Sequence, residues 1–223
     1  RELYAPFNLV PFAGGSTGVQ MAGWFNREIN SMSDIKGLKM RIPGLGGDVI
    51  TRAGGESVNI PGGELYTAMQ TGVIDATEWV GPYNDLAFGF HQVAKYYYYP
   101  GWHEPGPTLE FTVNKPALES LPADLQAIIE TAARAVNQDM LDEYTARNNT
   151  ALEELVNVHG VEVRKLPDEV IQGLRKLSAE AVSELTKDNE FAQRVAQSIE
   201  KFKQQATAYH GISEEAFYKA RKQ

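Results

Sequence analysis

Apolar residues alternate with basic ones in Leu38-Lys39-Met40-Arg41-Ile42-Pro43 (LKMRIP). A period of two is typical of a β-strand with one buried face, so this stretch predicts a strand. Arg41 then belongs to the opposite, polar face, directly before a glycine-rich turn. A second alternating run, TLEFTVN at residues 108–114, predicts another strand, and a short apolar run leads into Glu78.

Long helices are predicted in the second half of the chain. Downstream of Pro122, apolar residues keep helical spacing as far as Gly160, which indicates one helix of roughly 35 residues. Val161-Glu162-Val163 has the pattern of a strand, Pro167-Asp168 opens another helix, and a last helix carries apolar residues from Phe191 to Tyr209. We therefore expect an α/β region with a helical wrap.

The first half is rich in glycine and proline and is expected to hold shorter elements. Residues 19–29, after the turn at Gly14-Gly15, are predicted to form a helix. Residues 62–70 are predicted to form another, which Gly72 closes. The run Tyr96-Tyr97-Tyr98-Tyr99 is typical of a strand rather than of a ligand cage.

Composition narrows the classes of partner. The 223 residues are 43% hydrophobic with a net charge of -8, so nucleic acid and anionic membrane surfaces would be repelled. Cysteine is absent, which excludes disulfides and thiolate chemistry. No apolar run approaches the roughly 20 residues that span a bilayer. Because the chain begins at Arg1 without an initiator methionine or a signal segment, we expect it to be processed or truncated there.

Two glycine-rich segments resemble enzyme motifs. Gly14-Gly15-Ser16-Thr17-Gly18 fits G-x-S-x-G between an apolar run and an expected helix, the context of a serine nucleophile, so a serine esterase using Ser16 is one alternative. A plain glycine-rich turn is the other, since no histidine can be assigned to Ser16.

Gly44-Leu45-Gly46-Gly47 does not continue as a dinucleotide motif, because Val49 occupies the last glycine position. The four histidines form no familiar zinc spacing, which leaves oxygen ligation of a hard cation possible.

Arg41 and the stretch Ile74-Asp75-Ala76-Thr77-Glu78-Trp79-Val80-Gly81-Pro82 are the stronger clues. A guanidinium beside a rigid turn can take a carboxylate in bidentate fashion, although a solvated surface arginine is the alternative. Glu78 and Trp79 meet a Gly-Pro breaker, where a ligand site or a helix-capping acid with a core indole would both fit. Trp102-His103-Glu104 repeats the combination of an aromatic residue and a carboxylate in a rigid turn.

Several segments together resemble the solute-binding subunit (DctP type) of tripartite ATP-independent periplasmic (TRAP) transporters, over essentially the whole chain. The most specific parts are the arginine of R-x-P and the run G-x-I-D-x-x-E. The E-W-V-G-P version, with the P-G-W-x-E turn, resembles the 2-oxoacid-binding branch, whose members hold a small carboxylate beside a metal ion. The sialic-acid-type branch commonly has Glu-Asn where this chain has Glu78-Trp79. The segments are GLKMRIPG (37–44), GVIDATEWVGPYND (72–85) and YYYYPGWHEPGPTLEF (96–111).

The resemblance implies a role for each matching residue. Arg41 would clamp the substrate carboxylate. Gln20 would face both substrate and cation. Glu78 and Glu104 would give carboxylate oxygens, and Trp79 a backbone carbonyl, to a sodium or calcium ion, while the indole of Trp79 walls the pocket. Such a set is chemically coherent, because hard cations prefer several oxygen ligands.

The resemblance also implies the fold, an α/β two-lobe periplasmic binding protein with long C-terminal helices, of which the N-terminal part of the first lobe is missing. Closure of two lobes around the ligand is where such proteins gain affinity. The expected organisation is a remnant of lobe I and crossover at 1–13, lobe II at 14–107, a return strand and lobe-spanning helix at 108–160, and a C-terminal strand with helices at 161–223.

The expected function is capture of a small 2-oxo or 2-hydroxy carboxylate in the periplasm and its delivery to TRAP membrane subunits, without catalysis. A ligand-sensing ectodomain is a further alternative. The 2-oxoacid branch is known for dimers that exchange a C-terminal helix, and the apolar stripe Phe191, Val195, Ile199 and Phe202 makes a homodimer one hypothesis. Packing of that helix on its own lobe is the alternative.

Overall fold

A computed structural model describes residues 1–221, in which the chain divides into two compact units, residues 1–175 and residues 176 onward. Every strand of the described residues belongs to the first unit. The division falls inside helix α6 (Asp168–Thr186) rather than at a boundary expected from the sequence. The four-part organisation given above stays a prediction.

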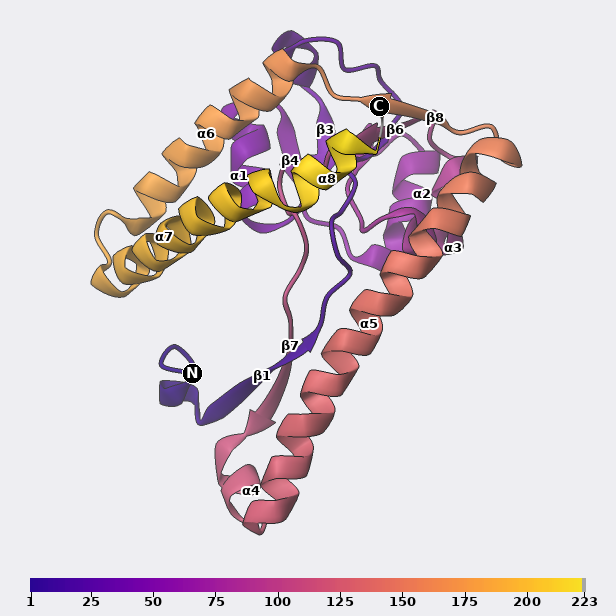
Figure 1. Ribbon diagram of the computed structural model, residues 1–223. Helices are drawn as coiled ribbons and strands as arrows, with labels where there is room; N and C mark the ends of the chain where they lie inside the picture. Colours follow the sequence, from indigo (N-terminus) through magenta and orange to yellow (C-terminus); the bar gives the residue numbers. More distant parts are fainter. Residues whose placement is uncertain (222–223) are drawn as a thin grey trace. The chain divides into compact units, whose positions relative to one another are not determined.

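The larger sheet of the first unit is mixed (Figure 1). Its spatial order is β4 (Glu56–Val58), β3 (Lys39–Arg41), β5 (Ala76–Thr77), β2 (Gly23–Phe25), β6 (Tyr96–Tyr99) and β8 (Glu162–Lys165). β3 runs parallel to β4 and β5, whereas β2 is antiparallel to β5 and β6. The strand expected in LKMRIP is confirmed, with Met40 buried as its alternation required.

A second sheet pairs β1 (Leu9–Gly15) with β7 (Leu109–Asn114) in antiparallel register. The long helix is α5 (Ala123–Asn157), whose 35 residues confirm the length inferred from its spacing. It packs against β1 and against α3 (Pro82–Phe88). The shorter helices of this unit are α1 (Gly44–Arg52), α2 (Leu65–Gln70) and α4 (Lys115–Glu119).

The helix expected at residues 19–29 is wrong, because β2 lies there. Gly23 adopts a φ of 130°, and a side chain at this position would meet the carbonyl oxygen of Thr77 at 2.4 Å. The backbone therefore approaches β5 more closely than a helix could. Pairing on both edges with β5 and β6 outweighs the local helical pattern.

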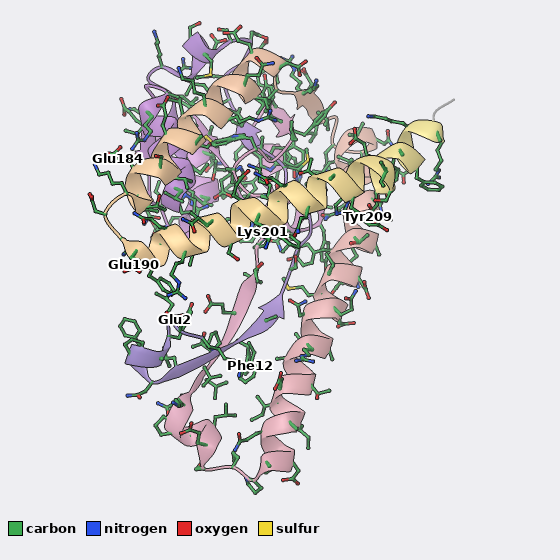
Figure 2. The ribbon with its side chains drawn as sticks, turned by 60° about the vertical axis from the view of Figure 1, so that its left-hand side comes forward. Glu2, Phe12, Glu184, Glu190, Lys201 and Tyr209 are labelled. Carbon is green, nitrogen blue, oxygen red and sulfur yellow. The ribbon has the colours of Figure 1, made fainter. Side chains whose placement is uncertain are left out.

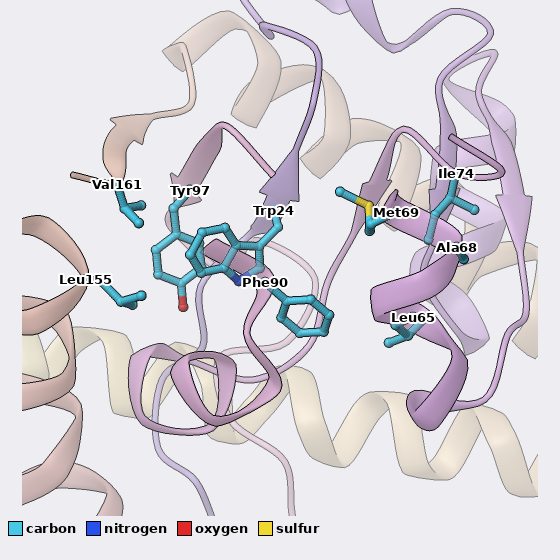
Figure 3. Close-up of a cluster of buried hydrophobic side chains, with 9 residues drawn as sticks. All are labelled: Trp24, Leu65, Ala68, Met69, Ile74, Phe90, Tyr97, Leu155 and Val161. Carbon is cyan, nitrogen blue, oxygen red and sulfur yellow. The ribbon is translucent and has the colours of Figure 1, made fainter. Parts of the chain in front are cut away.

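Aromatic residues fill the centre of the first unit's core (Figure 3). The rings of Trp24 and Tyr97, from neighbouring strands, stack with centroids 4.0 Å apart. Leu155, near the end of α5, is also fully buried in this cluster. The core thus joins the sheet to the long helix.

The second unit is helical. After the end of α6 it contains α7 (Glu190–Ile212) and α8 (Glu214–Ala220). Asn189 caps α7 by accepting a hydrogen bond from the Ala192 amide at 3.0 Å. Figure 2 labels Glu190, Lys201 and Tyr209 along this helix. None of the helices within residues 1–221 is both long and apolar enough to cross a membrane.

Candidate functional site

The site is built where two parallel strands end side by side. Arg41 is the last residue of β3 and pairs with Thr77, the last residue of β5. The Glu78 amide then donates to the Arg41 carbonyl at 3.1 Å. In α/β sheets the carboxyl ends of parallel strands are a common place for ligands.

Arg41 and Glu78 form a buried ion pair. Nη1 of Arg41 lies 2.5 Å from Oε1 of Glu78, and the side chains are 11% and 5% exposed. Nε of Arg41 also donates to the Ile60 carbonyl at 3.2 Å, which fixes the plane of the guanidinium. Arg41 is therefore not the solvated surface arginine that the sequence left open.

The indole of Trp79 is held on several sides. Its Nε1 donates to Oδ1 of Asn84 at 2.8 Å, and its ring lies 4.7 Å from that of Phe88, centroid to centroid. The guanidinium carbon of Arg41 lies 5.4 Å from the indole centroid, within the range of a cation–π contact. Asn84 in turn donates to the hydroxyl of Tyr144 on α5 at 2.6 Å. The turn is thus connected to the long helix.

The Asp85 side chain holds the turn that follows Glu78 and Trp79. Its fully buried carboxylate accepts hydrogen bonds from the Val80 and Gly81 amides, both at 3.1 Å, and from Trp24 Nε1 at 2.9 Å and the Tyr97 hydroxyl at 2.7 Å. Desolvation raises the pKa of Asp85 to about 6, against these hydrogen bonds, which lower it. This residue holds the backbone that follows Glu78 and Trp79.

A pocket of about 310 Å³ adjoins the ion pair. Glu78 and Glu104 both line it, together with His103, the residue before Glu104 in the sequence. Nε2 of His103 lies 3.4 Å from Oε2 of Glu78. Of the residues assigned from the sequence, Arg41, Trp79 and Gln20 are not among those that line this pocket in the described part of the chain. Its remaining lining is Pro43, Gly44, Leu45 and Gly46.

Gln20 approaches the same region from the segment before β2. Its carbonyl accepts from the Gly101 amide at 3.1 Å, and the neighbouring Met21 amide donates to Val80 at 3.1 Å. The Gln20 side chain is buried, and its Oε1 has no hydrogen-bond partner within residues 1–221. A buried amide oxygen without a donor is suited to a cation.

The donor set fits a hard cation. It offers two carboxylates, the free Oε1 of Gln20, and the carbonyl of Trp79, which accepts no hydrogen bond from the described residues although the carbonyls on either side of it do. Across residues 1–221 no group of three His, Asp or Glu side chains could hold a metal by themselves. Amide and backbone oxygens would therefore have to complete the ligation, as sodium and calcium allow.

Residues 4–189 match the family described as bacterial extracellular solute-binding protein, family 7, also named DctP. The chain belongs to this family. The resemblance drawn from the sequence motifs is confirmed, and the family is one of binding proteins rather than of enzymes, as expected.

The chain is also similar to a named relative. The monocarboxylate 2-oxoacid-binding periplasmic protein of Nostoc sp. is 46% identical over 215 residues, which are 96% of this chain and 58% of that protein. The chain therefore spans less than two-thirds of that relative's length.

Two solved structures have the same fold. A TRAP periplasmic solute-binding protein from Pseudoalteromonas atlantica, with bound sodium and pyruvate, is 41% identical with a TM-score of 0.93, over 98% of this chain and 66% of that one. One from Bordetella bronchiseptica, a dimer with calcium and picolinate, is 39% identical with a TM-score of 0.94, over 100% of this chain and 68% of that one. The expected periplasmic binding protein fold is confirmed.

The structure removes the support for a serine nucleophile. β1 ends at Gly15, and the next regular element is β2, so no helix follows GGSTG as the expected context required. Oγ of Ser16 instead accepts a hydrogen bond from the Gly18 amide at 3.3 Å. The expected turn at Gly14-Gly15 is wrong, because both glycines belong to β1, and residues 16–18 that follow are irregular.

Sequence reasoning assigned no role to His103, Asp85 or Asn84. His103 lies inside the P-G-W-x-E turn, but nothing in the spacing of that turn distinguishes it from a surface histidine. Asp85 and Asn84 lie in the segment GVIDATEWVGPYND, where the local signal is an acid three residues after the Gly81-Pro82 break.

Proposed function

We propose that this chain captures a small 2-oxo or 2-hydroxy carboxylate together with a sodium or calcium ion and delivers it to TRAP membrane subunits. The observation that carries the proposal is the buried Arg41–Glu78 pair beside a pocket lined by a second carboxylate, Glu104. A buried guanidinium and carboxylates in one site suit an anionic ligand and a cation together.

Arg41 would bind the ligand carboxylate through its planar fork. Glu78, Glu104, Gln20 and the carbonyl of Trp79 would hold the ion. A bound hard cation supplies positive charge that keeps neighbouring carboxylates ionised and attracts the oxygens of the ligand. The unpartnered Oε1 of Gln20 supports this set.

The ligand class is supported by the chemistry of the relatives' ligands. Pyruvate and picolinate, named for the Pseudoalteromonas and Bordetella proteins, each carry a carboxylate next to a second donor atom. The two structures differ in the ion, sodium in one and calcium in the other. We therefore propose either ion for this chain.

A periplasmic location and a homodimer complete the proposal. The Nostoc relative is named a periplasmic protein, and the Bordetella structure is a dimer. Val195, Ile199, Phe202 and Tyr209 of α7 are exposed apolar residues that a second copy of the chain could cover. Light scattering at high concentration should report a dimer, and a monomer would remove this part of the proposal.

Calorimetric titration tests the binding site. Pyruvate and longer 2-oxoacids are titrated into the protein expressed from its own gene, before and after removal of metal ions by chelation. We expect binding that disappears with the metal and in Glu78→Gln, while Glu64→Gln, at an exposed acid, binds as the unchanged protein does. Absence of heat across the series, with the protein folded, would reject this ligand class.

A further inference from the structure

The His103 side chain is buried in the candidate site and has no hydrogen-bond partner among the described residues. It is 5% exposed, and neither Nδ1 nor Nε2 makes a hydrogen bond within the described residues 1–221. The ring is one of the walls of the 310 Å³ pocket. A side chain in this position belongs to the site and not to the surface of the protein.

Leaving both nitrogens unpaired is costly. A buried polar atom without a hydrogen bond destabilises a protein by about 1–3 kcal/mol, and most such atoms in native proteins have a partner. Oε2 of Glu78 is within ion-pair distance of Nε2 at 3.4 Å but is not placed as a hydrogen-bond acceptor. The other oxygen, Oε1, is engaged by Arg41. The protein therefore satisfies the imidazole poorly by its own contacts.

The turn that carries His103 is held firmly in place. A side chain at Gly101 would meet the Gln20 carbonyl oxygen at 2.4 Å, and one at Gly106 would meet the Gly18 carbonyl oxygen at 2.9 Å. The Gly101 amide also donates to Gln20. These close backbone approaches on both sides of His103 position its ring against the pocket, so the unpaired nitrogens do not result from a loose loop.

We propose that His103 is a ligand-binding residue of this site, which donates an imidazole N–H to an oxygen of the bound 2-oxoacid. Either neutral tautomer of histidine carries one N–H, and the carboxylate and keto oxygens of the ligand are acceptors. Arg41 and His103 flank the carboxylate of Glu78 on its two oxygens. The ligand would thus meet two protein donors. This inference rests on the proposed function.

Three variants test the contact by calorimetry with pyruvate at saturating calcium. His103→Phe keeps a planar ring and removes both nitrogens, whereas His103→Gln retains an N–H donor. His91→Phe is the matched control, because Nδ1 of His91 is also buried and unpartnered but the residue does not line the pocket. We expect His103→Phe to raise the Kd for pyruvate about 10- to 100-fold, as loss of a hydrogen bond to a charged ligand does.

The other variants separate a ligand contact from a packing role. His103→Gln should recover most of the lost affinity, and His91→Phe should leave the Kd unchanged. An unchanged Kd in His103→Phe would overturn the inference, as would equal weakening in His103→Phe and His103→Gln. If the unsubstituted protein does not bind pyruvate, the proposed function, on which the inference depends, is rejected instead.

Discussion

Nη1 of Arg41 lies 2.5 Å from Oε1 of Glu78, in a pair of side chains that are almost entirely buried. The two residues are 37 positions apart in the sequence and meet because β3 and β5 run parallel. Each charge neutralises the other at a buried position where an unpaired charge would destabilise the fold.

Breaking this pair from one side should destabilise the fold. Arg41→Met leaves the Glu78 carboxylate buried without its cation, at a cost of about 3–5 kcal/mol. Adding Glu78→Gln should restore part of that loss, since the uncompensated charge is then gone. Urea unfolding of both single variants and the double variant measures the coupling. Strictly additive losses would show that the two side chains act independently.

Gly62 should tolerate no side chain. A Cβ there would lie 2.5 Å from Cη2 of Trp79, so Gly62→Ala must displace the indole. We expect a loss of about 1–3 kcal/mol, as for other overpacked sites, with a change in near-ultraviolet circular dichroism. Gly63→Ala is the control, because no atom lies within 4 Å of its Cβ position. Equal losses of stability and equal spectra in Gly62→Ala and Gly63→Ala would contradict this packing.

The bond between Asn84 and Tyr144 should stabilise the Trp79 turn. Tyr144→Phe removes the hydroxyl that accepts from Asn84 Nδ2, which should cost about 1 kcal/mol. Tyr83→Phe, which loses only an exposed 3.2 Å hydrogen bond to Glu143, should cost less. Chemical denaturation followed by tryptophan fluorescence compares them. A larger loss in Tyr83→Phe would argue against the connection to α5.

Asp85 should make stability depend on pH in a particular direction. Its pKa of about 6 lies above the ordinary value of 3.8, so the folded protein binds the proton more tightly than the unfolded chain does. The contribution that this raised pKa makes to the stability of the fold is present below pH 3.8 and is lost as the pH rises through 6. As the pH falls from 7 to 4, the free energy of unfolding of the unsubstituted protein should increase by up to about 2 kcal/mol relative to that of Asp85→Asn.

Denaturation at several pH values measures that difference. Asp139→Asn, at an exposed position of α5, is the control and should follow the unsubstituted protein. A difference between the unsubstituted protein and Asp85→Asn that stayed constant with pH would mean that Asp85 titrates normally.

Elements with a sustained pattern were predictable. The alternation around Met40 and the helical spacing from Pro122 to Gly160 both arise from burial of one face, so β3 and α5 could be inferred without the fold. β2 has only three residues, too few for a period to emerge, and its conformation depends on strands that lie more than 50 and 70 residues downstream.

Sequence motifs identified the family, and the resemblance to that family supplied the candidate ligands Arg41, Glu78, Trp79, Glu104 and Gln20. Tertiary structure decided which groups meet. The parallel pairing of β3 with β5 joins Arg41 to Glu78, and the close backbone approach at Gly101 brings the turn that carries His103 against the segment of Gln20. His103 is distinguished by its burial and by its two nitrogens without hydrogen bonds. Both properties depend on chain segments far apart in the sequence, so no local pattern could predict them.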